Sequence, residues 1–283
     1  MKYTFPWRIF SVVPTDAGIQ FMPPRELFMR LPAVRHSERV QRRLLDFSAA
    51  LFLLLLCAPV LFWAAIAVKL STPGPVLYRQ KRVGRGGRIF EIWKFRTMFT
   101  GPQSGPCVTA QDDTRITPLG KYLRSWKLDE LPQLFNVIRG EMSLVGPRPQ
   151  VPRFVDCFDA RLRRIILSVR PGMTGPTALY FRHEEFLLAG IADRECFYVK
   201  HLLPIKMQMD AEYVRIRTLR DDLGILADTL HLVVSRLTGQ AGRSGIAAVC
   251  DMAELTPAKS SSEENAEFIQ LAELERATAS KMV

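Results

Sequence analysis

The sequence feature that most constrains the fold is an apolar run from position 47 to position 68, FSAALFLLLLCAPVLFWAAIAV, which contains no charged residue. Its 22 residues are enough to cross a bilayer core about 30 Å thick as a straight helix. The run starts too late and extends too far for a cleaved signal peptide, and no small-residue cleavage site closes it. The chain is therefore predicted to contain a membrane segment.

Two properties of this run argue against a simple crossing. Pro59 lies near its middle, where a proline removes a backbone hydrogen bond and kinks a helix. Both flanks are basic, and positively charged residues prefer the cytoplasmic side. These residues are Arg35, Arg39, Arg42 and Arg43 before the run, and Lys69, Arg79, Lys81, Arg82, Arg85 and Arg88 after it. A re-entrant helix–break–helix satisfies both flanks, and a single spanning helix with a tolerated proline is the alternative.

The overall charge favours polyanionic partners. Lysine and arginine number 39 against 28 aspartate and glutamate, which gives a net charge of +11. Such a surplus suits nucleic acid, anionic lipid headgroups or phosphorylated substrates. The five cysteines are scattered and form no C-x-x-C pair, which argues against a disulfide framework and against a zinc site. No nucleic-acid-binding motif is recognised.

The most informative polar feature is the carboxylate pair Asp129 and Glu130, at the start of a predicted helix. Asp129 suits the N-cap, Pro132 suits the first turn, and Gly140 suits the C-terminal cap. A helix N-terminus stabilises anions, including phosphate. The pair is therefore a candidate site for phosphoryl chemistry. The alternative is that Asp129 only caps the helix and Glu130 faces solvent.

Two further segments carry positive charge next to turns. Residues 146–149 (GPRP) form a rigid turn that holds Arg148. Short strands are predicted at 76–78 and 89–94, around the glycine-rich turn 84–87. This hairpin is strongly basic. It matches no P-loop, and a solvated hairpin facing lipid headgroups explains it equally well.

The predicted fold class is α+β and mainly helical. A cytosolic extension (1–40) precedes the re-entrant membrane helix (41–70), broken at Pro59. A small cytosolic catalytic domain (71–238) follows, with the β-hairpin and interfacial amphipathic helices. Its helices are expected over 117–126, 151–168, 184–200 and 204–236. A polar tail (239–283) is expected to be disordered, with a short helix near 268–276.

Four ordered motifs resemble the bacterial sugar transferase family, the monotopic phosphoglycosyltransferases. The matching segments are GPVLYRQKRVG (74–84), WKFRTM (93–98), LDELPQLFNVIRGEMSLVGPRP (128–149) and RPGMTG (170–175). The resemblance covers roughly residues 41–236. It departs after RPGMTG, where residues 176–190 (PTALYFRHEEFLLAG) replace a run that many relatives carry near the nucleotide sugar.

The resemblance implies a membrane-bound enzyme that moves a phosphosugar from a UDP-sugar to polyprenyl phosphate and releases UMP. It would act on the cytosolic face of the bacterial inner membrane, among inner-membrane lipids, and begin the assembly of a surface glycan. Asp129 would be the nucleophile that forms a covalent intermediate and would bind Mg²⁺, with Glu130 as its partner. Arg148 would hold a phosphate. Further candidates for phosphate contacts are Lys94, Arg79, Arg96 and Arg170, each of which could instead contact headgroups or be structural.

A non-catalytic membrane scaffold of a glycan-assembly complex is the competing hypothesis. The intact carboxylate pair and Arg148 argue against it, because a scaffold has no need of them. A nucleic-acid binder would leave the apolar run unexplained. The sequence identifies neither the sugar nor the final glycan, and a homo-oligomer is compatible with it.

Overall fold

The computed structural model describes residues 11–15, 18–22, 36–100, 108–110, 113–182, 184–189, 191 and 193–237. Strands β1 (Ser11–Thr15) and β2 (Gly18–Met22) pair as an antiparallel hairpin that the sequence did not predict. This hairpin belongs to one of two compact units of the chain. The other unit, Pro32–Val233, carries the predicted membrane segment and the candidate site. The predicted tail, 239–283, lies outside the described residues.

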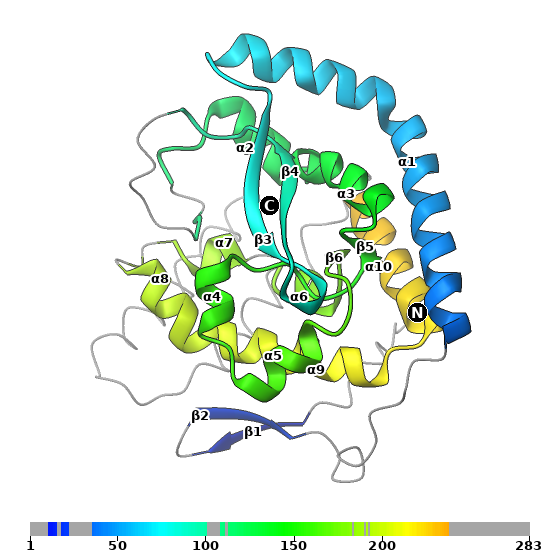
Figure 1. Ribbon diagram of the computed structural model, residues 1–283. Helices are drawn as coiled ribbons and strands as arrows, with labels where there is room; N and C mark the ends of the chain where they lie inside the picture. The colour runs from blue at the N-terminus through cyan, green and yellow to red at the C-terminus, as the bar shows by residue number, and fades with distance from the viewer. Residues whose placement is uncertain are drawn as a thin grey trace. The chain divides into compact units, whose positions relative to one another are not determined.

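The described part of the chain is mainly helical with short two-stranded sheets, which agrees with the predicted α+β class (Figure 1). After the first hairpin, the elements are α1 (His36–Ser71), β3 (Leu77–Val83), η3 (Arg85–Gly87), β4 (Ile89–Phe95), α2 (Pro118–Ser125), η4 (Leu128–Gln133), α3 (Leu134–Arg139), β5 (Ser143–Val145), α4 (Pro152–Asp156), α5 (Ala160–Ile166), β6 (Gly172–Thr174), α6 (Pro176–Tyr180), α7 (Glu184–Leu187), α8 (Arg194–Phe197), η5 (Tyr198–Leu202), α9 (Leu203–Ile216) and α10 (Leu219–Leu237).

The apolar run forms most of α1, one helix that continues through Pro59. Figure 1 shows that α1 bends between its two halves, and a proline inside a helix is a sufficient cause. The predicted break is therefore a bend within one helix. Among the described helices α1 is long and apolar enough to cross a membrane, and only 6% of its most apolar window is buried in the chain. It is thus not the core helix of this unit.

The first half of α1 is tied to the rest of the unit by polar side chains. Arg43 donates through Nη1 to the carbonyl of Val137 at 2.6 Å and through Nη2 to that of Ile138 at 2.7 Å. It thereby satisfies free carbonyls at the end of α3. The buried carboxylate of Asp46 accepts from Ser143 Oγ and from the backbone N–H of Leu144 in β5. These contacts hold α3 and β5 against α1.

The second half of α1 packs on the basic hairpin of β3 and β4. The two strands pair in an antiparallel register that places Leu77 opposite Phe95 and Arg79 opposite Trp93. Phe95 is buried with Ala64 and Val68 of α1. The predicted hairpin is confirmed, and its strands are longer than expected because pairing continues to the turn at Gly84.

Several segments that were each predicted to form one long helix form two shorter helices instead. The segment 151–168 forms α4 and α5, because Asp159 accepts from the N–H groups of Arg161 and Leu162 and starts a new helix. The segment 204–236 forms α9 and α10, since the backbone leaves the helical region at Arg217, where φ is −53° and ψ is 129°. Residues 184–200 include α7 and α8. The helix predicted over 117–126 is confirmed as α2, capped by Thr117.

Candidate active site

The carboxylate pair lies in η4, a 3₁₀ helix that leads directly into α3. The predicted N-cap role of Asp129 is wrong. The residue before η4 is Lys127, whose φ of 55° is in the left-handed region, and no side chain caps η4. This turn places Asp129 and Glu130 inside the first turn instead of ahead of it. Gly140 ends α3 with a φ of 81°, as predicted for a C-terminal cap.

Asp129 is almost completely buried, with 6% of its surface exposed. Its Oδ1 atom is buried and has no hydrogen-bond partner within the described part of the chain. Burial raises the pKa of Asp129 and the charge of Lys94 opposes this, while neighbouring Glu130 raises it further. A buried carboxylate oxygen without a partner is costly unless a ligand satisfies it. Asp129 is thus a candidate ligand-binding or reactive group.

Glu130 is at the centre of an ion-pair cluster. Its Oε1 atom lies 2.9 Å from Lys94 Nζ and 2.5 Å from Arg148 Nη2, and its Oε2 accepts from Arg148 Nη1 at 3.3 Å. Burial opposes ionisation of Glu130, but the charges of Arg148 and Lys94 outweigh it and hold its pKa well below the usual value. Glu130 is therefore ionised, and it neutralises part of the cluster's positive charge.

Arg148 is held by a close backbone crossing. Strands β5 and β6 run parallel, and Gly146 N donates to the carbonyl of Thr174 while Gly172 N donates to that of Pro147. A Cβ atom on Gly172 would lie 2.1 Å from Gly146 N, so only glycine allows this approach. The GPRP and RPGMTG motifs thus lock together, and Pro147 and Pro149 restrict the backbone that carries Arg148.

Lys94 is positioned by Asn136, a fully buried residue of α3. Asn136 Oδ1 accepts from the N–H of Trp93 at 3.1 Å, and its Nδ2 donates to the carbonyl of Glu91 at 2.7 Å. These bonds attach the edge of β4 to the helix that follows η4, which brings Lys94 to Glu130. The sequence analysis missed Asn136 because its partners are more than forty residues away.

The structure does not bring the other three predicted phosphate-binding arginines into this cluster. Arg96 is buried and donates to the carbonyls of Val68, Thr72 and Pro73 at the end of α1. Arg170 donates through Nε to the carbonyl of Gly140, after α3. Arg79 lies over the ring of Trp93. Of the seven predicted site residues, Asp129, Glu130, Lys94 and Arg148 are the ones that the structure gathers.

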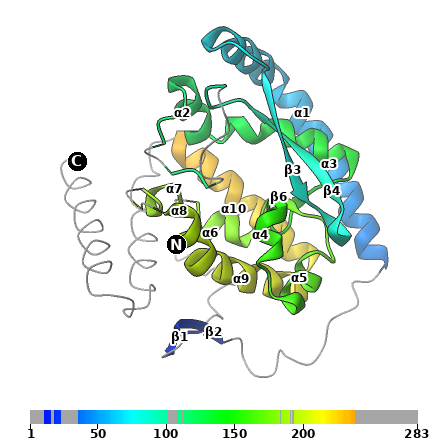
Figure 2. The same cartoon turned by 60° about the vertical axis from the view of Figure 1, so that its left-hand side comes forward.

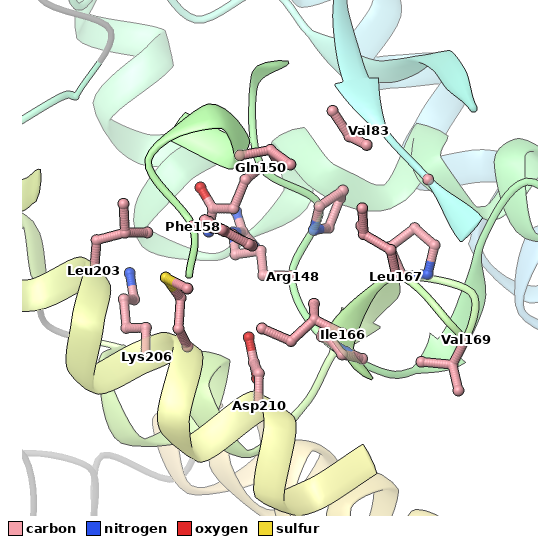
Figure 3. Close-up of a pocket in the computed structure, with 16 residues that line it drawn as sticks. Val83, Arg148, Gln150, Phe158, Ile166, Leu167, Val169, Leu203, Lys206 and Asp210 are labelled. Carbon is pink, nitrogen blue, oxygen red and sulfur yellow. The ribbon is translucent and has the colours of Figure 1, made fainter. Parts of the chain in front are cut away.

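A cavity lies beside Arg148, lined by residues that the sequence analysis did not select (Figure 3). Lys206 and Asp210 reach it from α9, and Phe158, Ile166, Leu167 and Leu203 form apolar walls. Lys206 is buried and paired with Glu184, while Thr177 Oγ1 donates to Asp210 Oδ1 at 2.8 Å. Burial raises the pKa of Asp210 to about 7. Thr177 and Glu184 lie far from Lys206 and Asp210 in the sequence, and the two pairs come together only in the folded chain.

The residues present fit a magnesium ion, which the family resemblance implies. Magnesium prefers oxygen ligands, often one or two carboxylates together with water and substrate phosphates. The unpartnered Oδ1 of Asp129 is such an oxygen. No group of three or more His, Cys, Asp or Glu side chains suited to a metal occurs among the described residues. Substrate phosphates and water are the usual further ligands of magnesium at such a carboxylate.

The model of the bacterial sugar transferase family matches residues 37–236, so the chain belongs to this family. The match contains α1, the β3–β4 hairpin, the carboxylate pair and both interlocked motifs. The family resemblance drawn from the sequence motifs is confirmed.

Curated relatives are similar to this chain over part of their length. A UDP-glucose:undecaprenyl-phosphate glucose-1-phosphate transferase of Caulobacter vibrioides is 46% identical over 51% of this chain and 55% of the relative. A UDP-N-acetylgalactosamine-undecaprenyl-phosphate N-acetylgalactosaminephosphotransferase of Aeromonas hydrophila is 44% identical over 47% of this chain and 32% of the relative. An undecaprenyl-phosphate glucose phosphotransferase of Komagataeibacter xylinus is 35% identical over 68% of this chain and 36% of the relative. The matched regions thus span about half of these relatives or less.

Proposed function

We propose that this protein transfers a phosphosugar from a UDP-sugar to undecaprenyl phosphate and releases UMP. The observation that carries the proposal is the buried, unpartnered Oδ1 of Asp129 beside the cluster of Lys94, Glu130 and Arg148. The printed activities of the relatives support this reaction class. The relatives differ in the sugar that they transfer, so a panel of UDP-sugars is needed to identify the donor.

In the proposed first step, a carboxylate oxygen of Asp129 attacks the phosphorus that carries the sugar. A bond forms between aspartate oxygen and phosphorus, the P–O bond to the UMP phosphate breaks, and UMP leaves with the bonding electron pair. In the second step, an oxygen of the lipid phosphate attacks the same phosphorus and the aspartate carboxylate is restored. The covalent intermediate divides one difficult transfer into two easier ones.

The charges around Asp129 suit this chemistry. Attack by an anion on a diphosphate needs positive groups that are fixed before the reaction begins. Lys94 and Arg148 are fixed by Glu130, and 36% of the Arg148 side chain remains exposed to contact a substrate phosphate. Mg²⁺ bound at Asp129 would neutralise phosphate charge and act as a Lewis acid. In this proposal Arg148 and Lys94 bind substrate phosphate, and Glu130 holds both cations in position.

We further propose that α1 enters and leaves the membrane on its cytosolic face. The exposed apolar side chains of α1 include Phe52 and Trp63, whereas basic residues flank both of its ends. This course would keep the site next to the headgroups of the bacterial inner membrane, where a polyprenyl phosphate acceptor is held. The product would begin an exopolysaccharide, capsule, O-antigen or other glycoconjugate.

The test is UMP release from the purified protein with undecaprenyl phosphate and a panel of UDP-sugars. The proposal expects release that requires one UDP-sugar, the lipid acceptor and Mg²⁺. A Lys121→Gln variant serves as a control, because this exposed lysine lies in α2 and outside the cluster. Folded protein that releases no UMP with any UDP-sugar would favour a non-catalytic scaffold.

A further inference from the structure

Trp93 is enclosed by two arginines from different elements. The guanidinium carbon of Arg79, in β3, lies 4.9 Å from the centroid of the Trp93 ring, and that of Arg139, in α3, lies 4.3 Å from it. Phe135 adds a second aromatic ring at 5.8 Å. A guanidinium within about 6 Å of an aromatic ring is attracted to it, so the stack holds two positive charges in place.

These two charges have no acidic partner within the described part of the chain. Arg79 and Arg139 are both exposed, and no carboxylate of the described residues forms an ion pair with either. Phe135 is 43% exposed next to them. Two fixed cations beside an exposed aromatic ring form a surface that suits an anion at an apolar boundary.

The cluster lies in the bend of α1. On one face of the hairpin, the pair Leu77 and Phe95 packs under the second half of α1, and Arg79 and Trp93 are the next pair on that same face. Arg139 directly follows Ile138, whose carbonyl is bonded by Arg43 from the first half of α1. Figures 1 and 2 both show β3, β4 and α3 beside α1, within its bend.

We propose that the cluster of Arg79, Trp93, Phe135 and Arg139 binds phosphate groups of anionic lipid headgroups beneath α1. The proposal rests on the membrane placement of α1 given above. The apolar face of α1 is exposed on both halves, as at Leu51 and Trp63, and lipid would cover it. Headgroups then meet the chain in the bend, where the net charge of +11 favours anionic ones. If the partner were a soluble polyanion, the exposed apolar face of α1 next to the cluster would stay in contact with water.

The experiment measures lipid retention by the full chain in an uncharged detergent, using native mass spectrometry with added phosphatidylglycerol or phosphatidylcholine. The test variant is Arg79→Gln with Arg139→Gln. The matched control is Arg85→Gln with Arg88→Gln, which removes the same charge from exposed residues at the turn of the same hairpin. The wild type is expected to prefer phosphatidylglycerol. The test variant should lose roughly 30-fold in affinity, and the control should change less than about twofold.

Equal retention of phosphatidylglycerol by the test variant and the wild type would overturn the proposal. Displacement of the lipid by inorganic phosphate, at matched ionic strength, would also overturn it by identifying a soluble-anion site. The membrane placement is checked separately, because α1 should keep every variant in the membrane fraction of cells. Wild-type protein found outside that fraction would contradict the placement of α1 instead.

Discussion

Glu130 and Arg148 form a bidentate ion pair, in which Arg148 Nη2 lies 2.5 Å from Glu130 Oε1 and Arg148 Nη1 lies 3.3 Å from Glu130 Oε2. The pair joins the carboxylate motif to the GPRP turn, 18 residues later in the chain. Lys94 shares the same carboxylate, so a single glutamate orients both cations proposed to hold phosphate. Removal of its charge therefore tests whether the cluster acts as one unit.

Glu130→Gln should lower the rate of UMP release by about 100-fold while the protein stays folded. An amide cannot hold two cations as a carboxylate does, and a small displacement of groups that position a substrate has an effect of this order. Steady-state kinetics with the preferred UDP-sugar would measure it. The control is Glu195→Gln, which removes a carboxylate that pairs with the exposed Arg153. A Glu130→Gln rate within about twofold of wild type would exclude the positioning role.

Arg96→Lys should destabilise the protein by about 2–3 kcal/mol, because one ammonium cannot replace the bonds that the Arg96 guanidinium makes to Val68, Thr72 and Pro73. Thermal unfolding in detergent would measure the loss, with Arg88→Lys as the exposed control. The folded fraction should retain activity. A stable but inactive Arg96→Lys protein would instead support the phosphate-binding role predicted from the sequence.

The sequence predicted helix ends correctly where the signal depends only on neighbouring residues. Thr117 followed by Pro118 starts α2, and Gly140 ends α3, since each acts on its own turn of backbone. Asp129 shows the limit of this approach. Its short side chain suits a cap, but the left-handed turn at Lys127 places it inside η4 instead. The left-handed backbone conformation of Lys127, two residues earlier, thus determines where η4 begins and why Asp129 does not cap it.

Residues that act over long distances in sequence were not predictable. The sequence indicates only that Asn136 lies in a helix, yet its side-chain amide joins α3 to the backbone of β4. Arg96 lies in a basic motif, yet its guanidinium donates hydrogen bonds to backbone carbonyls at the end of α1. Only the tertiary structure supplies these partners, because no spacing rule relates their positions. The sequence therefore indicated the carboxylate pair of the candidate site, but not the residues that position it.

Asp210 makes stability depend on pH. Burial raises its pKa in the folded protein to about 7, from an ordinary value of 3.8. Between these values the folded state binds more protons than the unfolded state, so stability falls as pH rises, by up to about 1.4 kcal/mol per unit. Asp210→Asn should remove this slope. Unfolding measured from pH 4.5 to pH 7 checks it, with the exposed Asp156→Asn as control. Equal slopes for Asp210→Asn and wild type would contradict the pKa assignment.

The proposed re-entrant course of α1 predicts that both of its flanks face the cytosol. Single cysteines would replace Arg39, before the apolar run, and Arg88, after it, in a background without the native cysteines. A membrane-impermeant maleimide should label neither site in intact cells and both sites after permeabilisation. Labelling of either flank from outside would show a helix that spans the membrane.

The most direct test of the account is whether Asp129 becomes covalently attached to the phosphosugar. Purified protein would be mixed with its UDP-sugar and Mg²⁺ without lipid acceptor, and its intact mass measured with peptide mapping of residues 127–140. The account predicts one added phosphosugar on Asp129 of the wild type and none on a folded Asp129→Asn variant, which should also release no UMP. An adduct on another residue, or turnover by the folded variant, would contradict it.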